Sequence, residues 1–303
     1  MKLTADKDLN EKNVLFITLD SCRYDTAQKA NTPTIEGIDQ MRQAYTHGSY
    51  TIPAHIAFFS GHLPAAFEEP KQAYYSECIK QLWRIRTGRA TESKPAGIEL
   101  EGNNILGGYE KLGFYILGAG GVTQFAERSL LRQYFKEFLY CSKNLDEEPL
   151  NPRKKQEFPL THIDEIVSRL KGHDRWFLFI NCNETHYPYD TGEGVPLEIE
   201  KTYLDLKKRL NLREPANYSK LNKEICDGLK EMQIRALEKI DKRIEHLIAE
   251  IPKQRNILTV ICADHGENFG EAFCGRQRFG HLIPTPEVMR VPLVIGEINA
   301  KHN

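Results

Sequence analysis

The segment NVLFITLD, Asn13 to Asp20, decides the fold class of this chain. It is a nearly continuous run of β-branched and apolar residues that ends on a carboxylate, which is typical of a parallel strand buried on both faces. The same format returns in Phe114 to Leu117, in Trp176 to Cys182 and in Ile257 to Ala263. Val291 to Ile295 is a fifth candidate strand, although no polar residue ends it. These runs predict the strands of one buried sheet.

Helical patterns lie between the candidate strands. Lys71 to Thr87 has apolar residues at helical spacing, Thr161 to Lys171 begins with a residue that can cap a helix, and Lys220 to Glu250 carries one long apolar stripe. Alternating strands and helices predict an α/β fold with three layers, in which helices cover both faces of a mainly parallel sheet. We expect a single domain over residues 1–303, with insertions or loops near 65–100, 143–160 and 190–219.

Composition excludes several classes of protein. The 303 residues are 40% hydrophobic and 27% charged, and the net charge of −1 gives no field for binding nucleic acid or an anionic membrane. The apolar runs are far shorter than the roughly 20 residues that span a bilayer, and the N-terminal segment lacks the apolar core of a signal peptide. Seven cysteines without a C-x-x-C pair favour reduced thiols. We therefore expect a cytoplasmic protein without nucleic-acid or membrane partners; its oligomeric state stays open.

Polar residues follow three of the predicted strands. Asp20, His186 and the pair Asp264-His265 stand at or just beyond strand ends, where open α/β sheets bind ligands. Carboxylates with an imidazole suit Mn²⁺ or Zn²⁺, and oxygen-rich sets suit Mg²⁺ or Ca²⁺. These residues predict a divalent metal site, although an Asp-His pair on its own is also explained by capping of a turn or helix.

The segment SYTIPAH, Ser49 to His55, precedes a short apolar helical stretch. Pro53 suits the first turn of a helix, so Thr51 is expected just ahead of the helix N-terminus, where free N–H groups favour an anion. A hydroxyl at this place is a nucleophile towards a phosphate or sulfate ester if a metal or base deprotonates it. For an isolated threonine, an ordinary helix cap is the better explanation of this pattern.

Taken together, four blocks resemble the sulfatase branch of the alkaline phosphatase-like superfamily, in that family's order and approximate separations. The blocks are NVLFITLDSCRYD, THGSYTIPAHIAFFSGHLP, FLFINCNETHYPYD and VICADHGENFGE, and GH and PEVMRVPLVIG follow the last of them. The T-x-P-x-H motif at Thr51 to His55 and the A-D-H-G-E-x-x-G-E motif at Ala263 to Glu271 are specific when they occur together.

The resemblance implies a role for each matching residue. Asp20, Asp264 and His265 match metal ligands, and Thr51 stands at the position of the nucleophile, which also contacts the metal. His186 matches a histidine that contacts substrate or leaving group, where it can donate a proton. His281 matches a position that faces the substrate or, with another carboxylate that the sequence does not name, a second metal. We expect His281 and Arg278 to contact the oxygens of a small anionic ester, with one or two divalent ions bound.

Three departures from the family pattern matter. Thr51 replaces the cysteine that sulfatases convert to formylglycine, so chemistry through an aldehyde hydrate is excluded. Ser21 replaces a second adjacent aspartate, which lowers the charge of the site and favours Zn²⁺ or Mn²⁺. Few residues follow Ile295, so we expect no sulfatase C-terminal subdomain.

The sequence therefore predicts a metal-dependent hydrolase of phosphate or sulfate esters, with phosphoesters favoured. Two alternatives are a phosphoryl-type transferase of the same superfamily and a catalytically silent relative that binds an anionic ligand or a protein. His55 is expected to support the site rather than bind metal, and Arg23 is either a site contact or an ion-paired residue. The basic segment 80–94 is best explained as a solvated helix face.

Overall fold

The computed structural model describes residues 8–61, 83–85, 98–100, 104–127, 129, 131–141, 158–211 and 221–300. A seven-stranded sheet lies at its centre, in the order β2-β11-β8-β1-β7-β5-β6. Strands β8, β1, β7, β5 and β6 run parallel, and β11 pairs antiparallel with both β8 and β2. The strands are β1 (Asn13–Leu19), β2 (Arg42–Tyr45), β5 (Tyr115–Gly120), β6 (Glu137–Tyr140), β7 (Trp176–Cys182), β8 (Ile257–Ala263) and β11 (Arg290–Ile298).

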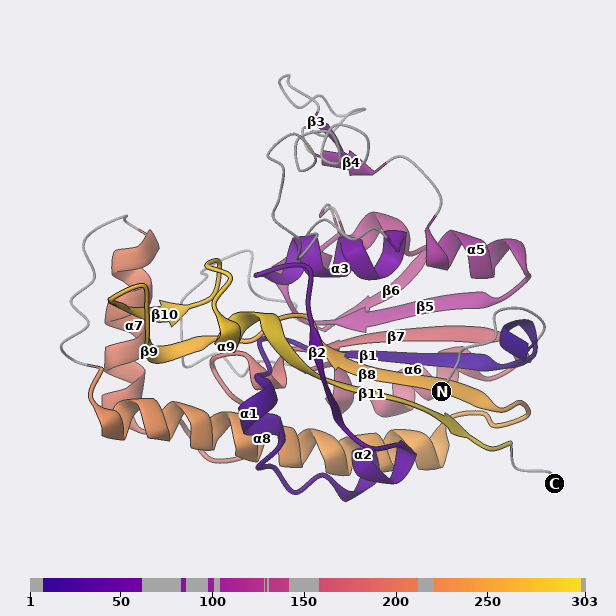
Figure 1. Ribbon diagram of the computed structural model, residues 1–303. Coiled ribbons are helices and arrows are strands. Elements are labelled where there is room, and N and C mark those ends of the chain that lie inside the picture. Colours follow the sequence, from indigo (N-terminus) through magenta and orange to yellow (C-terminus); the bar gives the residue numbers. More distant parts are fainter. Residues whose placement is uncertain are drawn as a thin grey trace.

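Helices cover both faces of the sheet (Figure 1). On one face lie α3 (Thr51–Ser60) and α5 (Ile105–Lys111), and on the other lie α1 (Tyr24–Ala27), α2 (Pro33–Ile38), α6 (Ile163–Leu170) and α8 (Lys223–Glu250). Each face has its own apolar core, because the central strands are buried on both sides. The three-layer, mainly parallel architecture confirms the predicted fold class.

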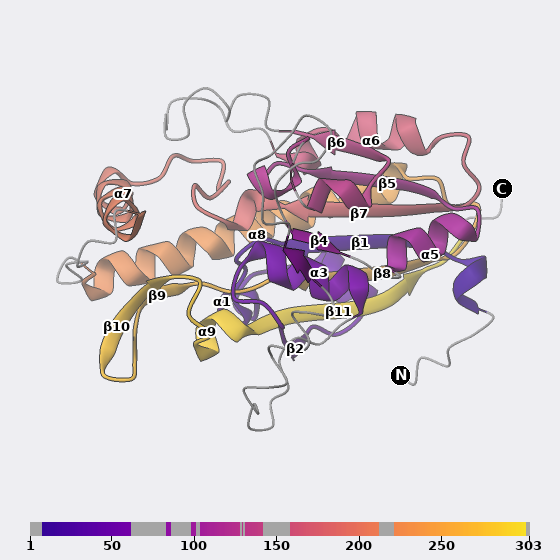
Figure 2. The same cartoon turned by 90° about the horizontal axis from the view of Figure 1, so that it is seen from above.

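Further elements lie beyond the carboxyl ends of the parallel strands (Figure 2). They are α7 (Leu197–Asn211), the antiparallel hairpin β9 (Asn268–Phe273) and β10 (Arg276–Gly280), and α9 (Pro286–Met289). A third apolar cluster, which includes the aromatic residues Tyr187, Tyr203 and Phe279, joins α7, α8 and the hairpin. The short 3₁₀ turns are η1 (Asp8–Glu11), η2 (Thr123–Phe125), η3 (Leu131–Tyr134), η4 (Pro159–Thr161) and η5 (Asn183–Thr185).

One sequence expectation is wrong in detail. Within the helix predicted over 71–87, Trp83–Ile85 forms strand β3, because it pairs antiparallel with β4 (Ile98–Leu100). The remaining residues of that predicted helix lie outside the described residues. The segment 190–219, expected to be an insertion or loop, contains α7. The five predicted strands, and the helices over 161–171 and 220–250, are confirmed within a few residues at their ends.

Among the described residues, no helix combines the length and apolar character needed to cross a membrane. The longest, α8, has 28 residues; its apolar stripe and two polar residues, Gln233 and Asp241, are buried, and most of its charged residues lie on the outer side.

The packing of α8 gives a direct test of this architecture. Ile244 is fully buried in the core between α8 and the sheet, and the next residue, Glu245, is exposed. We expect Ile244→Ala to lower the free energy of unfolding by about 2–5 kcal/mol, because it removes buried methylene groups and leaves a cavity. Glu245→Ala is the matched control, with an expected change within about 0.5 kcal/mol in chemical denaturation. Equal effects of the two variants would contradict this placement of α8.

Candidate metal centre

The register of the central strands brings the first candidate ligands together. Leu19 of β1 is level with Ala263 of β8 and with Cys182 of β7, so Asp20 and Asp264 leave neighbouring strands at the same height. The Asp20 N–H donates to the Cys182 carbonyl at 2.8 Å, which continues the strand pairing by one residue. Asp20, Asp264 and His265 each offer a ligand atom within 4.8 Å of the others, and all three side chains are buried. We call this group the first cluster.

The first cluster fits a cation. Asp20 Oδ2, Asp264 Oδ2 and His265 Nε2 are buried and have no hydrogen-bond partner within the described part of the chain. His265 donates its Nδ1–H to the Gly266 carbonyl at 2.9 Å, so Nε2 carries the lone pair, 3.5 Å from Asp264 Oδ2. Metal-bound histidines are commonly held through the second ring nitrogen in this way. Two buried carboxylates and an imidazole lone pair therefore converge on one point.

Burial raises the pKa of the two carboxyl groups and lowers the pKa of the imidazole, and a bound cation would lower the carboxyl pKa values again. Desolvation, together with the charge of Asp264, raises the pKa of Asp20. Desolvation raises the pKa of Asp264 to about 7 and lowers the pKa of His265 to about 4. In the metal-free protein, two close carboxyl groups thus tend to keep protons, which metal binding would displace.

A second cluster adjoins the first. His186, Glu267 and His281 offer ligand atoms within 4.8 Å of one another, and the rings of His281 and His265 lie 4.5 Å apart between centroids. His281 Nδ1 is 3.4 Å from Glu267 Oε1; although burial favours the neutral ring, this carboxylate raises the pKa of His281. Glu267 is the carboxylate that the sequence analysis did not name, even though it lies inside the A-D-H-G-E-x-x-G-E motif.

His186 reaches this place through the turn after β7. The strand ends at Cys182, and η5 carries the chain across the carboxyl end of the sheet. His186 donates its Nδ1–H to the Tyr187 carbonyl at 2.6 Å, so Nε2 is the nitrogen with a lone pair. The structure thus brings His186 and His281 together, as the sequence predicted, with ring centroids 5.9 Å apart.

Thr51 is the first residue of α3 and is nearly buried, instead of preceding the helix as predicted. His55, one turn later, donates its Nδ1–H to the Thr51 carbonyl at 2.7 Å and accepts from the Thr18 hydroxyl through Nε2 at 3.1 Å. Its Nδ1 lies 3.7 Å from Asp264 Oδ2, and burial lowers its pKa to about 3. His55 is therefore a neutral supporting residue that ties Thr51 to the first cluster. The role of the Thr51 hydroxyl stays a prediction.

Arg23 is ion-paired and buried, one of the two roles that the sequence left open. It pairs with Asp25 at 2.7 Å and with Glu271 at 2.6 Å, and it donates to the Glu267 carbonyl at 3.1 Å. Desolvation opposes its charge, but these carboxylates raise the pKa of Arg23. Arg23 thus anchors the segment that carries Glu267.

Two backbone features shape the turns that carry the ligands. A Cβ at Gly266 would lie 2.0 Å from the Glu287 carbonyl oxygen, so this glycine allows the close approach of α9. Ser21, at the position of the missing aspartate, has a left-handed backbone with φ of 60°. Its N–H donates to Asp264 Oδ1 at 3.1 Å and its hydroxyl to Asp20 Oδ1 at 3.3 Å, so it supports the carboxylates that remain.

Arg278 lies on β10, half-buried, and belongs to neither cluster. Its Nε is buried without a hydrogen-bond partner among the residues that the structure describes. Contact of Arg278 with substrate stays a prediction.

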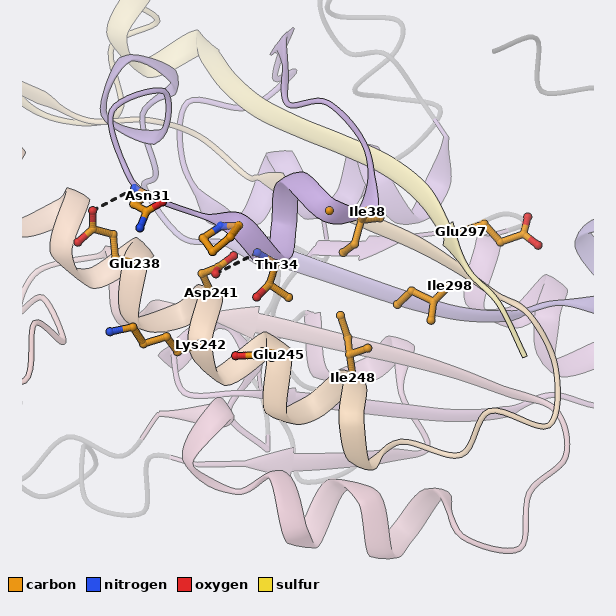
Figure 3. A pocket seen from close by; sticks show the side chains of 12 residues that line it. Asn31, Thr34, Ile38, Glu238, Asp241, Lys242, Glu245, Ile248, Glu297 and Ile298 are labelled. Carbon is orange, nitrogen blue, oxygen red and sulfur yellow. Dashed lines mark hydrogen bonds between the residues drawn. The ribbon is translucent and has the colours of Figure 1, made fainter. Parts of the chain in front are cut away.

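A groove of about 640 Å³ lies between α2, α8 and β11, and none of its lining residues belongs to either cluster (Figure 3). Two of its acidic side chains have structural partners. Asp241 accepts from the N–H groups of Thr34 and Ile35, and Glu238 accepts from Asn31 N–H. This groove is therefore a seam between packed helices, and the candidate centre lies at the strand ends.

The chain belongs to the sulfatase family, whose model matches residues 12–302. A comparison with curated protein sequences gave no match. Among solved structures, the C-terminal periplasmic domain of EptC from Escherichia coli in complex with Zn is 13% identical, with 94% of this chain and 72% of that chain covered and a TM-score of 0.56.

Two other structures are similarly related. The C-terminal periplasmic domain of phosphoethanolamine transferase EptC from Campylobacter jejuni is 14% identical, covering 95% of this chain and 79% of that one, with a TM-score of 0.53. A protein in the alkaline phosphatase superfamily from Vibrio parahaemolyticus is 14% identical over 96% of this chain and 61% of that chain, with a TM-score of 0.50. The chain thus shares the alkaline phosphatase-like fold of these proteins, one of which was solved in complex with Zn.

The ionisation of Asp264 predicts a pH dependence of stability. Its pKa in the folded, metal-free protein, about 7, lies above the ordinary 3.8, so the folded state binds more protons and stability falls as pH rises between these values. Asp264→Asn keeps an acceptor oxygen for Ser21 and His265 but cannot ionise. We expect the metal-free variant to gain stability relative to wild type from about pH 4 to about pH 7, in thermal denaturation with a chelator.

The same variant tests the metal. Zn²⁺ or Mn²⁺ should raise the melting temperature of the wild-type protein, because a ligand that binds only the folded state stabilises it. Asp264→Asn should lose most of this increase, since it removes a charge from the first cluster. Equal metal-induced increases in both proteins would place the ion elsewhere.

Proposed function

We propose that this chain is a metal-dependent enzyme that transfers the phosphoryl or sulfuryl group of an ester, with phosphoesters favoured, and that Thr51 is its nucleophile. The observation that carries the proposal is the junction of two ligand clusters at the carboxyl ends of β1, β7 and β8, next to the N-terminus of α3. His55 links Thr51 to the first cluster, since its Nδ1–H donates to the Thr51 carbonyl and its Nδ1 lies 3.7 Å from Asp264 Oδ2.

The proposed metal ligands follow from the two clusters. Asp20, Asp264 and His265, with the Thr51 hydroxyl, would hold the first ion, and His186, Glu267 and His281 would hold a second. The mixture of carboxylate and imidazole favours Zn²⁺ or Mn²⁺ over Mg²⁺ or Ca²⁺, and a zinc complex among the similar structures supports this choice. A bound divalent ion would lower the pKa of the nucleophile's hydroxyl and offset the charge that develops on the ester oxygens.

The chemistry proceeds in two displacements. Thr51 Oγ attacks phosphorus and gives its proton to water, the bond from phosphorus to the leaving oxygen breaks, and the phosphoryl group stays on Thr51. The leaving oxygen takes a proton, which His186 supplies from Nε2 only when both ring nitrogens carry protons, since its Nδ1–H is held by the Tyr187 carbonyl. Water, or an acceptor alcohol, then attacks the same phosphorus, the bond from phosphorus to Thr51 Oγ breaks, and the proton of the attacking group restores the Thr51 hydroxyl. One nitrogen of His186 cannot hold an ion and deliver a proton at the same time, so the number of bound ions decides its role.

Transfer to an acceptor alcohol is the second candidate, and the similarity to phosphoethanolamine transferases favours it. Both reactions share the first displacement and differ only in what attacks the phosphorus of phosphorylated Thr51. Turnover of an aryl phosphoester with and without a small alcohol such as glycerol separates them: a hydrolase releases phosphate in both cases, whereas a transferase forms a phosphorylated alcohol. A catalytically silent relative would bind vanadate or phosphate without turning over any aryl phosphate, phosphodiester or sulfate.

The substrate is proposed to be a small anionic ester in the cytoplasm. The six cysteines among the described residues are all free, which supports a reducing compartment.

Replacement of Thr51 tests its role as nucleophile. Thr51→Ala should lower turnover of an aryl phosphoester by several orders of magnitude with little change in folding, whereas Thr51→Ser should keep part of the rate. Ser60→Ala is the matched control, because it removes a hydroxyl from the other end of α3, where the Ser60 hydroxyl donates to the Ile56 carbonyl. Near-native rates in metal-loaded Thr51→Ala would mean that water attacks the substrate directly.

The second ion is tested by stoichiometry. We expect metal titration of the wild-type protein to give two equivalents, and Glu267→Gln to lose one of them because the second cluster loses its carboxylate. Asp241→Asn is the control: it changes another buried carboxylate, whose partners are N–H groups of α2. A single equivalent in the wild-type protein would leave His186 and His281 to contact substrate instead.

A further inference from the structure

Gln233 of α8 is fully buried and uses both ends of its side-chain amide. Its Nε2 donates to the carbonyl of Ser21 at 2.8 Å and to the carbonyl of Thr185 at 3.1 Å. Its Oε1 accepts from the N–H of Arg23 at 3.1 Å and from the hydroxyl of Thr26 at 2.6 Å. Carbonyl oxygens only accept and a backbone N–H only donates, so these partners fix the orientation of the amide.

Two of these partners are residues adjacent to proposed metal ligands. Ser21 follows Asp20 of the first cluster, and Thr185 precedes His186 of the second. Thr185 also donates its hydroxyl to the Asp20 carbonyl at 2.8 Å. The amide of Gln233 and the hydroxyl of Thr185 therefore close a ring of hydrogen bonds between the turn after β1 and the turn after β7.

The turn at Ser21 depends on such support. A serine in the left-handed region is less stable than one in an ordinary conformation, and it persists only where its surroundings fix it. Asp264 holds the N–H of Ser21 and Gln233 holds its carbonyl, so the peptide groups on both sides of this residue are fixed. The direction of the Asp20 side chain follows from this turn.

We propose that Gln233 is a positioning residue that sets the separation and orientation of the two metal clusters. This inference rests on the proposed function, because it assigns Gln233 to the ions that the clusters would hold. None of the four hydrogen-bond partners of Gln233 is a proposed ligand atom. It acts through the backbone of Ser21 and Thr185, and so affects one ligand of each cluster.

The test compares metal affinity with stability. Gln233→Met keeps a similar unbranched shape and removes all four hydrogen bonds, and Gln233→Asn keeps the amide on a stem shorter by one methylene. We expect Gln233→Met to weaken the binding of both equivalents of Zn²⁺ by about 10- to 100-fold, the usual effect of losing a residue that orients metal ligands. Gln233→Asn should give a smaller loss. The measurement is competition with a chelator of known affinity, with folding checked by circular dichroism.

Asp241→Leu is the matched control. Asp241 lies on the same helix, is equally buried and also accepts backbone N–H groups, but these belong to α2, far from the clusters. A purely structural role for Gln233 would lower the melting temperature in both variants and leave the affinity for Zn²⁺ unchanged in both. We expect the loss of affinity in the Gln233 variants alone.

The outcomes separate this inference from the proposed function. If the wild-type protein binds two equivalents and folded Gln233→Met binds them as tightly, the positioning role is wrong and the proposed metal sites remain. If Asp241→Leu weakens binding as much as Gln233→Met, the effect is general destabilisation and the inference is also wrong. If the wild-type protein binds no metal, both the proposed function and the inference fall. Should Gln233→Met not fold, Gln233→Asn decides by the same criteria.

Discussion

Two carboxylates buried side by side are the constraint on which the rest of the centre depends. The parallel register of β1 with β8 places Asp20 and Asp264 at the ends of neighbouring strands, and both side chains are buried. Two negative charges so close together and removed from water cannot both persist unless a positive charge compensates them. The fold therefore either keeps protons on this pair or binds a cation there.

No lysine or arginine forms a salt bridge with this pair among the described residues. His55 is buried and has a pKa of about 3, and the pKa of His265 is about 4, so neither ring brings a charge near neutral pH. The Glu267 carboxylate raises the pKa of His281 in spite of burial, and this ring lies 3.4 Å from Glu267. Arg23 is held by Asp25 and Glu271. Neutral donors, such as the N–H groups of Ser21 and His265, satisfy one oxygen of Asp264 and leave the other directed into the cluster. These features support the proposed ion between the two carboxylates.

The second cluster extends this logic to the elements beyond the sheet. Glu267 comes from the segment before β9, His281 follows β10, and His186 follows β7. The hairpin and α7 pack around the third apolar cluster, which brings the side chains of Glu267, His281 and His186 to one place. The proposed ester chemistry depends on the proximity of the two clusters, because two ions close together could act on the same ester.

Much of this arrangement could be predicted from local sequence. Buried strands such as Asn13–Leu19 are recognised by their unbroken apolar runs, and the polar residues after them indicate the edge of the sheet where ligands bind. What could not be predicted depends on contacts between distant segments. In the sequence, Glu267 is an ordinary glutamate after a turn, and only the folded hairpin places it beside His281. Gln233 likewise looks like a polar residue on an amphipathic helix, and only the structure shows that its amide donates to the Ser21 carbonyl. Trp83–Ile85 forms a strand because it pairs with Ile98–Leu100, which lies 13 to 17 residues away in the chain.

The most direct test of this account is anomalous diffraction from crystals of the protein grown with Zn²⁺ and measured at the zinc edge. The account predicts a peak within about 2.0–2.3 Å of ligand atoms of Asp20, Asp264 and His265, close to the Thr51 hydroxyl, and a second peak among His186, Glu267 and His281. Crystals that contain zinc but show no peak at the carboxyl ends of β1 and β8 would contradict it.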